Sequence, residues 1–382
     1  MMKDGKKVFL LGMLILALVL AGCNSDSPEE LSATAANFND VINSIKAKPG
    51  NYVINLTGDL IDYPGALVET AGVNITVKGT GANKITWKYV DGKPPLFWVK
   101  AGKLSFENIN LSRAVGNTQD WPLIVAEKDG TIEIKNGVVL STDINVGVMS
   151  SGALIMSGGT IKNCGVWLGG GTFTMSGGTI ENGEIGTNGS GLSITMKGGT
   201  IRGDGNGISL WGDSENCTVN ISGGTISGNG GNGVVLDGKN DKLTMTGGTI
   251  SGSGGDGIIL GDESKNCTVT ISGGTISGNG GTGVLLVGSG NTFTMSGGTI
   301  EKSKNYGLRL DGADVGFEKK KGAVIYGDSG VNKNGDGAIR VKCQKNDSNS
   351  LQLKVDAGKD DVYAAKINAG QTDITGKQGP NW

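Results

Sequence analysis

Apolar and polar residues alternate with a period of two in a short segment that recurs through the middle of the chain. The segment reads MSGGTI at 156–161 and returns, lightly changed, at 175–180, 196–201, 221–226, 245–250, 271–276 and 295–300. Two residues before each segment begins there is a further apolar column, made of Leu154, Phe173, Ile194, Val219, Leu243, Val269 and Phe293. This alternation is typical of a strand with one buried face, and it excludes a helix.

A Gly-Gly pair interrupts each repeat, because glycine reaches positive φ at low cost and lets the backbone turn. A second short strand, Thr-Ile-x, follows the pair, and a third follows a looser turn rich in glycine, asparagine and serine. The third strand stands at 207–210, 233–236, 257–260, 283–286 and 307–310. Three short strands and three bends in about two dozen residues predict one coil of a parallel β-helix, which is stable only when stacked on neighbouring coils.

The same columns extend beyond the regular repeats. Ile85, Leu111 and Val139 continue the isoleucine column toward the N-terminus, and Val324 continues it toward the C-terminus. Together with the seven repeat isoleucines they predict about eleven coils of ~24 residues each. We therefore expect an all-β, single-stranded, right-handed parallel β-helix over residues 49–343, roughly 50 Å long from the spacing of strands.

Residues 1–22 predict a signal sequence. Three lysines precede an apolar run over 8–21 that is too short for a comfortable membrane span. Leu20-Ala21-Gly22-Cys23 resembles the lipobox of bacterial lipoproteins, which implies cleavage before Cys23 and diacylation of its sulfur, for example with palmitate. The lipid would anchor the protein to a membrane, and residues 23–33 would form the lipidated cysteine and a flexible tether. An ordinary signal followed by a chance cysteine is the alternative.

Both ends of a β-helix need a cover, because an exposed end coil offers unpaired strand edges. Phe38, Val41, Ile42 and Ile45 have helical spacing, so residues 34–48 are expected to form a capping helix; a helix that binds a partner is the alternative. Residues 344–382 are expected to form a C-terminal capping segment that adds a last coil or folds back along the side.

Composition and charge favour an extracytoplasmic scaffold over a nucleic-acid-binding protein. The chain has 70 glycines in 382 residues and a formal charge of −2, with no basic patch for nucleic acid. No histidine is present, which excludes imidazole catalysis and zinc bound by histidine. Cys217 and Cys267 recur two coils apart, roughly 9.6 Å by the strand spacing, too far for a disulfide. We interpret the cysteines after Cys23 as free, partly buried thiols.

Four aspartates are the acidic candidates for catalysis or for weak calcium binding. Asp213, Asp237, Asp262 and Asp311 each lie within three residues of the end of a third strand. Hydrolases and lyases with a β-helix fold need carboxylates clustered on adjacent coils. Aspartate is also a common turn residue, so the alternative is a solvated edge without a catalytic role or a metal. The segment at 230–235 lacks the aspartate of repeat calcium motifs, and we expect no cofactor.

A row of apolar residues is expected to point outward from the third strands. Val235, Ile259 and Leu285 occupy equivalent positions in consecutive coils and would form a contact stripe if exposed. A covering loop or the C-terminal segment is the alternative. Trp98, Trp121 and Trp167 are candidates for stacking on sugar rings, although Trp98 and Trp167 stand within apolar strands, where core packing is the favoured interpretation.

A family resemblance rests on the MSGGTI and ISGGTISGNGG coils, the 317–327 stretch with its Val-Ile-Tyr-Gly, the late 337–341 stretch and the terminal Trp382. These features resemble the repetitive surface lipoproteins of spirochaetes such as Treponema. More loosely, the coils are similar to repeats of polymorphic outer-membrane proteins and of pectate-lyase-like enzymes. The resemblance implies a β-helix in the cell envelope, at the outer membrane and either on the cell surface or facing the periplasm. It implies no catalytic motif.

The sequence therefore predicts a lipid-anchored envelope protein that acts as a non-catalytic surface module, binding a glycan or a host matrix protein as an adhesin or serving a structural role. The alternative function is a polysaccharide lyase or a glycoside hydrolase. A groove with charged residues that converge from neighbouring coils would favour the enzyme.

Overall fold

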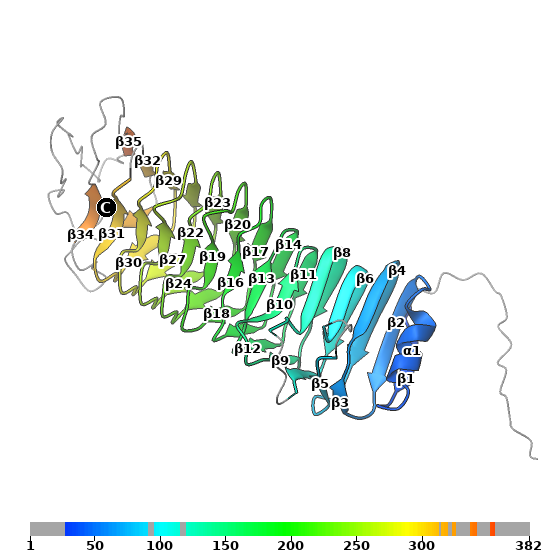
Figure 1. Ribbon diagram of the computed structural model, residues 1–382. Coiled ribbons are helices and arrows are strands. Elements are labelled where there is room, and N and C mark those ends of the chain that lie inside the picture. The colour runs from blue at the N-terminus through cyan, green and yellow to red at the C-terminus, as the bar shows by residue number, and fades with distance from the viewer. Residues whose placement is uncertain are drawn as a thin grey trace, which may run out of the picture.

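The computed structural model describes residues 27–90, 95–114, 120–312, 315–319, 323–325, 337–341 and 352–355. Within these residues the chain winds into one elongated right-handed parallel β-helix (Figure 1). The predicted signal sequence, Cys23, Cys343 and most of the predicted C-terminal segment lie outside the described residues. In the part of the chain that is described, no helix has the length and apolar character needed to cross a membrane.

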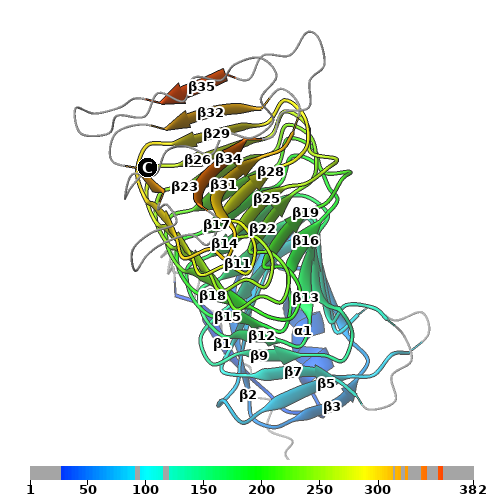
Figure 2. The ribbon, with the colours of Figure 1, turned by 90° about the vertical axis from the view of Figure 1, so that its left-hand side faces the viewer.

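Each coil contributes three strands to two parallel sheets (Figure 2). The second strands form a 12-stranded sheet. Its members are β3 (Leu60–Tyr63), β5 (Lys84–Trp87), β7 (Asn110–Arg113), β9 (Val139–Ser141), β12 (Thr160–Lys162), β15 (Thr179–Glu181), β18 (Thr200–Arg202), β21 (Thr225–Ser227), β24 (Thr249–Ser251), β27 (Thr275–Ser277), β30 (Thr299–Glu301) and β33 (Val324–Ile325).

The first and third strands of the coils belong to one 23-stranded sheet. The ladder of first strands runs through β1 (Glu29–Ala33), β2 (Gly50–Leu56), the later halves of β4 (Ala66–Lys78), β6 (Phe97–Glu107) and β8 (Ile124–Ile134), then β11 (Ala153–Met156), β14 (Thr172–Met175), β17 (Ser193–Met196), β20 (Thr218–Ile221), β23 (Lys242–Met245), β26 (Thr268–Ile271), β29 (Thr292–Met295), β32 (Gly316–Lys319) and β35 (Gln352–Val355).

The ladder of third strands starts in the first halves of β4, β6 and β8. It continues through β10 (Val146–Ser150), β13 (Gly165–Leu168), β16 (Ile185–Thr187), β19 (Ile208–Leu210), β22 (Val234–Leu236), β25 (Ile258–Leu260), β28 (Val284–Leu286), β31 (Tyr306–Leu310) and β34 (Gly337–Val341). In the first coils the third strand runs without a break into the first strand of the next coil, so β4, β6 and β8 serve both ladders.

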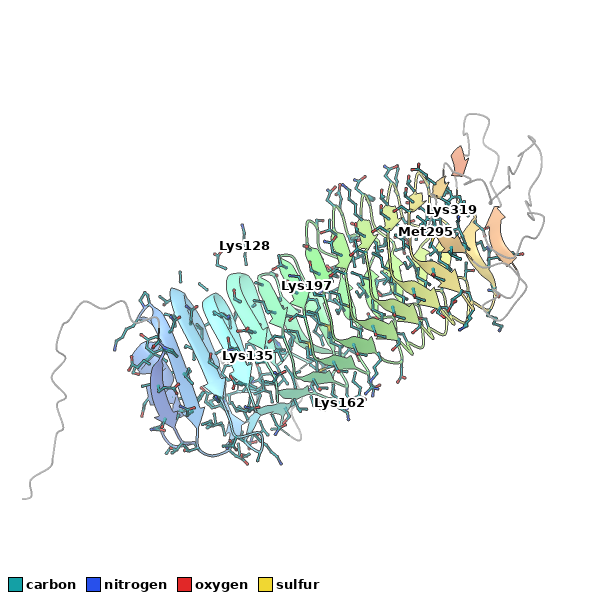
Figure 3. The ribbon with its side chains drawn as sticks, turned by 180° about the vertical axis from the view of Figure 1, so that it is seen from behind. Lys128, Lys135, Lys162, Lys197, Met295 and Lys319 are labelled. Carbon is teal, nitrogen blue, oxygen red and sulfur yellow. The ribbon has the colours of Figure 1, made fainter. Side chains whose placement is uncertain are left out.

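The predicted columns form the core. Ile161 lies beside Ile180, and Ile180 beside Ile201, in strict parallel register, and all three side chains are fully buried. The side chains of these columns are buried along the length of the solenoid. Figure 3 shows the side chains that its coils carry. The second glycine of the repeat turns the corner at positive φ, as at Gly178 (φ 83°), where a Cβ would collide with the carbonyl oxygen of Gly158 in the coil below.

The structure corrects the predicted number of coils and two positions in the isoleucine column. The 12-stranded sheet begins at β3, one coil earlier than predicted, because Leu60 lies beside Ile85. Leu140 and Ile325, not Val139 and Val324, occupy the buried column. Each wrong residue stands next to a second large apolar residue, so the period-two pattern fits either register.

Helix α1 (Phe38–Ile45) covers the N-terminal end of the solenoid, as predicted (Figure 1). Its Phe38 ring meets Tyr63 of β3 edge-on with centroids 5.4 Å apart, and the Tyr63 hydroxyl donates to Asn39 Oδ1 at 2.7 Å. The predicted tether ends earlier than expected, because residues 29–33 form β1, which pairs with β2. Strand β1 thus extends the 23-stranded sheet by one strand, and helix α1 contacts both β1 of that sheet and Tyr63 of the 12-stranded sheet.

At the other end, β34 and β35 continue the ladders of third and first strands. Strand β35 lies in the segment that was predicted either to add a last coil or to fold back along the side. Its parallel pairing with β32 favours an added coil. Cys164, Cys217 and Cys267 are free, as predicted. Their side chains are buried, whereas the sequence predicted partly buried thiols.

Candidate functional site

A polar groove crosses the outer face of the first-strand ladder near the N-terminal end. The inward residues of β4, such as Ile75 and Val77, are completely buried, so the residues between them face outward. Parallel register then places Asn51, Asn74 and Lys103 in one row and Thr76, Ser105 and Glu133 in the next. The hollow has a volume of about 370 Å³. We call it the charged groove.

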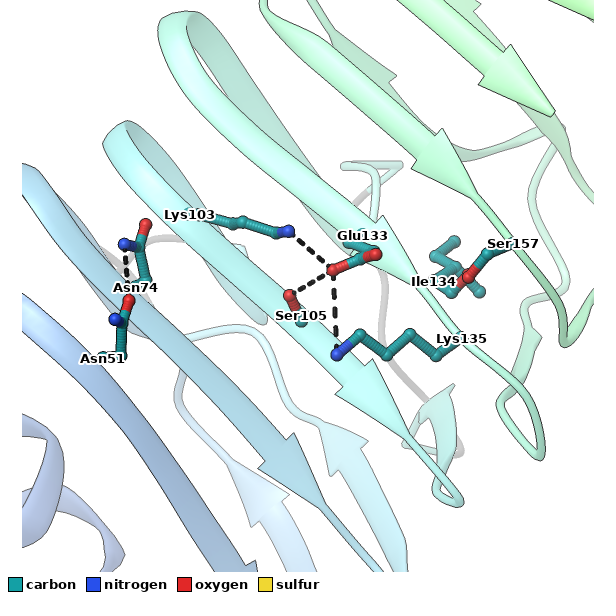
Figure 4. Close-up of polar contacts among 8 residues, drawn as sticks. All are labelled: Asn51, Asn74, Lys103, Ser105, Glu133, Ile134, Lys135 and Ser157. Carbon is teal, nitrogen blue, oxygen red and sulfur yellow. Dashed lines mark hydrogen bonds and ion pairs between the residues drawn. The ribbon is translucent and has the colours of Figure 1, made fainter. Parts of the chain in front are cut away.

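Glu133 lies at the centre of the charged groove, between two lysines (Figure 4). Lys103 Nζ is 2.8 Å from Glu133 Oε2, Ser105 Oγ donates to the same oxygen at 2.9 Å, and Lys135 Nζ is 3.8 Å away. The carboxylate side chain is only 15% exposed. Burial alone would raise the pKa of Glu133, but the hydrogen bonds from Lys103 and Ser105 and the charges of both lysines hold this pKa below its ordinary value.

A second ion pair and two amides extend the groove. Lys78 Nζ lies 3.1 Å from Glu107 Oε1, and Asn74 Nδ2 donates to Asn51 Oδ1 at 2.9 Å. Three lysines and three glutamates line the hollow, so its positive and negative charges are equal in number. Amines, carboxylates, amides and hydroxyls on adjacent coils offer donors and acceptors at regular intervals.

These residues were not among the predicted site residues. Their signal is visible in Lys103-Leu-Ser105-Phe-Glu107, where the outward positions are charged or carry a hydroxyl, whereas the later coils carry mainly Thr, Ser and Asn there. Charge in those positions marks the outer face of the early coils, but only the register shows that Lys103, Glu133 and Lys135 meet.

The four predicted aspartates do not form one column. Asp237 and Asp311 follow the third strand directly, but Gly261 and Val287 hold the equivalent positions in the two coils between them. Asp311 forms an ion pair with Arg309. Asp213 is exposed.

Asp262 does approach Asp237. Burial raises the pKa of Asp237, and the charges of Glu263 and Asp262 raise this pKa further. The backbone N–H of Glu263 donates to Asp237 Oδ1 at 2.9 Å and lowers the pKa in part. Across the described residues no group of three or more acidic, cysteine or histidine side chains is placed to hold a metal ion.

The predicted contact stripe is mostly covered. Val235 and Leu285 are 7% and 9% exposed, and Ile259 is half-buried. The stripe is part of a longer outward column of the third strands, which includes Leu67, Trp98, Val125, Met149, Trp167, Gly186, Ser209, Val235, Ile259, Leu285 and Arg309. Core packing was therefore the wrong interpretation for Trp98 and Trp167, which point outward between buried neighbours. Trp121 is 48% exposed.

A family comparison agrees with the fold. A family model described as a right handed beta helix region matches residues 206–351. The chain is similar in structure to the periplasmic alginate epimerase AlgG, with a TM-score of 0.46, 10% identity and coverage of 85% of this chain and 82% of that one. It is also similar to the A-module of the Azotobacter vinelandii mannuronan C-5 epimerase AlgE6, with a TM-score of 0.37, 15% identity and coverage of 86% and 87%. A search of curated proteins finds no significant match.

Proposed function

We propose that the protein acts on an extracellular polysaccharide in the charged groove, as an enzyme of the lyase type. The observation that supports this proposal is the convergence of Lys103 and Lys135, from different coils, on the single carboxylate of Glu133. Charged residues that converge across neighbouring coils are the feature that favours an enzyme over a purely structural surface. Ser105 and the amides of Asn51 and Asn74 add hydrogen-bonding groups suited to sugar hydroxyls.

The chemistry of the groove fits elimination better than hydrolysis. A glycoside hydrolase needs a carboxylic acid with a raised pKa to protonate the leaving oxygen, whereas the pKa of Glu133 is lowered. Elimination at a uronate instead needs cations that neutralise the sugar carboxylate, so that the neighbouring carbon can lose its proton. The Glu133 carboxylate accepts that proton, the C–O bond to the next sugar breaks, the leaving oxygen takes a proton from the Lys103 ammonium, and a C=C bond forms. Lys135, at 3.8 Å the more loosely held of the two lysines, is placed to bind that carboxylate.

The proposed location is the cell envelope, with lipid on Cys23 as the anchor and the solenoid held outside the membrane. The apolar run before Cys23 and its Leu-Ala-Gly-Cys sequence support this location. A non-catalytic adhesin remains the second candidate function, because a regular face of Thr and Ser side chains suits broad contact with a glycan.

The test incubates the purified protein with a uronate polysaccharide and with a neutral polysaccharide, and follows chain length by mass spectrometry and unsaturated products by ultraviolet absorbance. Lys135→Ala and Glu133→Gln are the groove variants. Lys242→Ala is the matched control, because Lys242 stands in the same outward row as Lys103, six coils further along, and is exposed.

We expect unsaturated fragments from the uronate polymer alone, a large loss of rate in both groove variants and no loss in Lys242→Ala. Retention of a polymer without any shortened or unsaturated product would reject the enzyme and support the adhesin. Cleavage that survives both groove variants would place the active site elsewhere.

A further inference from the structure

A second hollow lies on the face of the third-strand ladder, over β10, β13 and β16. Its volume is about 440 Å³, within the range of roughly 300–1,000 Å³ that is usual for small-molecule sites. The side chains that matter in its wall are Trp167, Glu184, Asn163, Asn182 and Asp204. We call it the tryptophan pocket. None of these residues belongs to the charged groove.

The glycine beside Trp167 leaves room for its indole. In the next coil Gly186 is the register partner of Trp167, and a Cβ at Gly186 would lie 3.0 Å from Trp167 Cζ3 and 3.1 Å from Cε3. Such contacts are tighter than most real Cβ contacts, so the six-membered ring of the indole lies close to the backbone of Gly186. Trp167 remains half-buried and forms part of the pocket wall.

Trp98, three coils earlier in the same outward column, offers a weaker platform. Lys100 Nζ lies 4.9 Å from the centroid of the Trp98 ring, so a cation already occupies one face of that ring. Trp167 is therefore the tryptophan of this column that we assign to a ligand.

Glu184 faces the same space as the indole. Its Oε1 lies 3.5 Å from the position that a Cβ of Gly186 would take. The backbone N–H of Asn206 in the next coil donates to the carboxylate, while burial raises the pKa of Glu184. On the rim, Asn182 Nδ2 donates to Asn163 Oδ1 at 3.1 Å, and Asp204 is exposed. An apolar ring thus stands beside a carboxylate and two amides.

The charged residues in the wall of the tryptophan pocket restrict the charge of a ligand that can bind there. Two acidic residues and no basic residue line the tryptophan pocket, so an anionic ligand would be repelled. An aromatic ring with planar polar groups at its edge matches a pyranose, whose C–H face is apolar and whose rim carries hydroxyls.

We propose that the tryptophan pocket binds one pyranose unit without negative charge, either neutral or bearing an amine. The sugar stacks on Trp167 and donates hydrogen bonds to the Glu184 carboxylate and to the Asn163 and Asn182 amide oxygens. This site is separate from the charged groove and selects sugars of different charge, so the protein would hold two kinds of sugar at once.

The test uses titration calorimetry of the purified protein with the methyl glycosides of glucose, glucosamine and glucuronate. The expected order of affinity is glucosamine first, glucose second and glucuronate undetected. Trp167→Ala should weaken binding at least about tenfold, as expected for loss of an aromatic stack, and Trp167→Phe should retain part of it. Glu184→Gln keeps an oxygen for the Asn206 N–H but removes the charge, so it should abolish the preference for glucosamine over glucose.

Trp121→Ala is the control, because Trp121 is exposed and lies outside the pocket wall. Binding by Trp167→Ala equal to that of the unmodified protein would overturn the proposal, and so would a preference for glucuronate or the absence of any binding by the unmodified protein. Should Trp167→Ala fail to fold, the Phe and Gln variants still decide the matter. The outcome is independent of polymer cleavage in the charged groove.

Discussion

Lys103 Nζ and Glu133 Oε2 lie 2.8 Å apart on the outer face of the sheet, although a complete coil of chain separates the two residues. The contact exists because the parallel register aligns Ser105 with Glu133 and places Lys103 one pleat away on the same face. A cross-coil contact of this kind both joins two coils and shapes the charged groove.

Glu133 should stabilise the fold at neutral pH and not in acid. Its pKa in the folded protein is lowered, so its contribution is present above the pKa of the unfolded chain, about 4.3, and is lost as the pH falls through the lower folded value. At pH 7, Glu133→Gln should reduce the free energy of unfolding by about 1–2 kcal/mol. Urea denaturation at neutral pH and at low pH would measure this.

The difference between the unmodified protein and Glu133→Gln should shrink in acid. Glu127→Gln is a suitable control, because it removes an exposed carboxylate from β8, the strand that carries Glu133. A difference that stays constant over the whole pH range would show that the ion pair does not stabilise the fold.

Asp241 should contribute to stability with a pH dependence opposite to that of Glu133. It is fully buried, and burial raises its pKa although Ser214 Oγ and the Cys217 N–H donate to its carboxylate at 2.7 and 2.8 Å. A raised folded pKa means that its favourable contribution is present at low pH and is lost as the pH rises through that value. Asp241→Asn should therefore raise the stability at pH 8 by about 1 kcal/mol and have less effect at pH 5.

A natural precedent for that substitution stands two coils further along. Asn291 accepts from the Cys267 N–H at 2.9 Å and donates to Ser264 Oγ at 2.8 Å, which reproduces both contacts with an uncharged side chain. Asp241→Ala removes the contacts altogether and should destabilise the protein at both pH values. If Asp241→Asn behaved like Asp241→Ala, the buried charge would be needed for the fold.

The three described thiols should be inert in the folded protein. Burial raises the pKa of Cys164 to about 12 and that of Cys267 to about 11, and it also raises the pKa of Cys217. Iodoacetamide at pH 8 should leave these three cysteines unmodified, and unfolding in urea should expose all of them to the reagent. Peptide mapping by mass spectrometry distinguishes the sites, and rapid labelling of any of the three under native conditions would contradict their buried positions.

The repeats predicted the coils well because each Gly-Gly pair fixes where a strand ends. Once the turn is fixed, Ile161 and its equivalents can only point inward, and the structure buries all of them. The pair is absent before Leu140, where two apolar residues stand side by side. Either residue could then be the buried one, and Val139 was predicted in place of Leu140.

The candidate sites were harder to predict because they depend on the register between strands of neighbouring coils. Trp167 stands between Val166 and Leu168 in an apolar strand, and its outward direction follows only from alternation with those two buried neighbours. The contact between Lys103 and Glu133 depends on a bulge between Val99 and Ala101 that shifts the register, and no local pattern reveals that shift.

The central claim is that the charged groove holds a polysaccharide, and lysine labelling tests it most directly. The protein is acetylated briefly with and without a saturating uronate polysaccharide, and the modified lysines are quantified by mass spectrometry. We predict that the polymer protects Lys78, Lys103 and Lys135 and leaves Lys242 unchanged. Equal labelling of these four lysines in the presence of bound polymer, or protection of Lys242 alone, would contradict the claim.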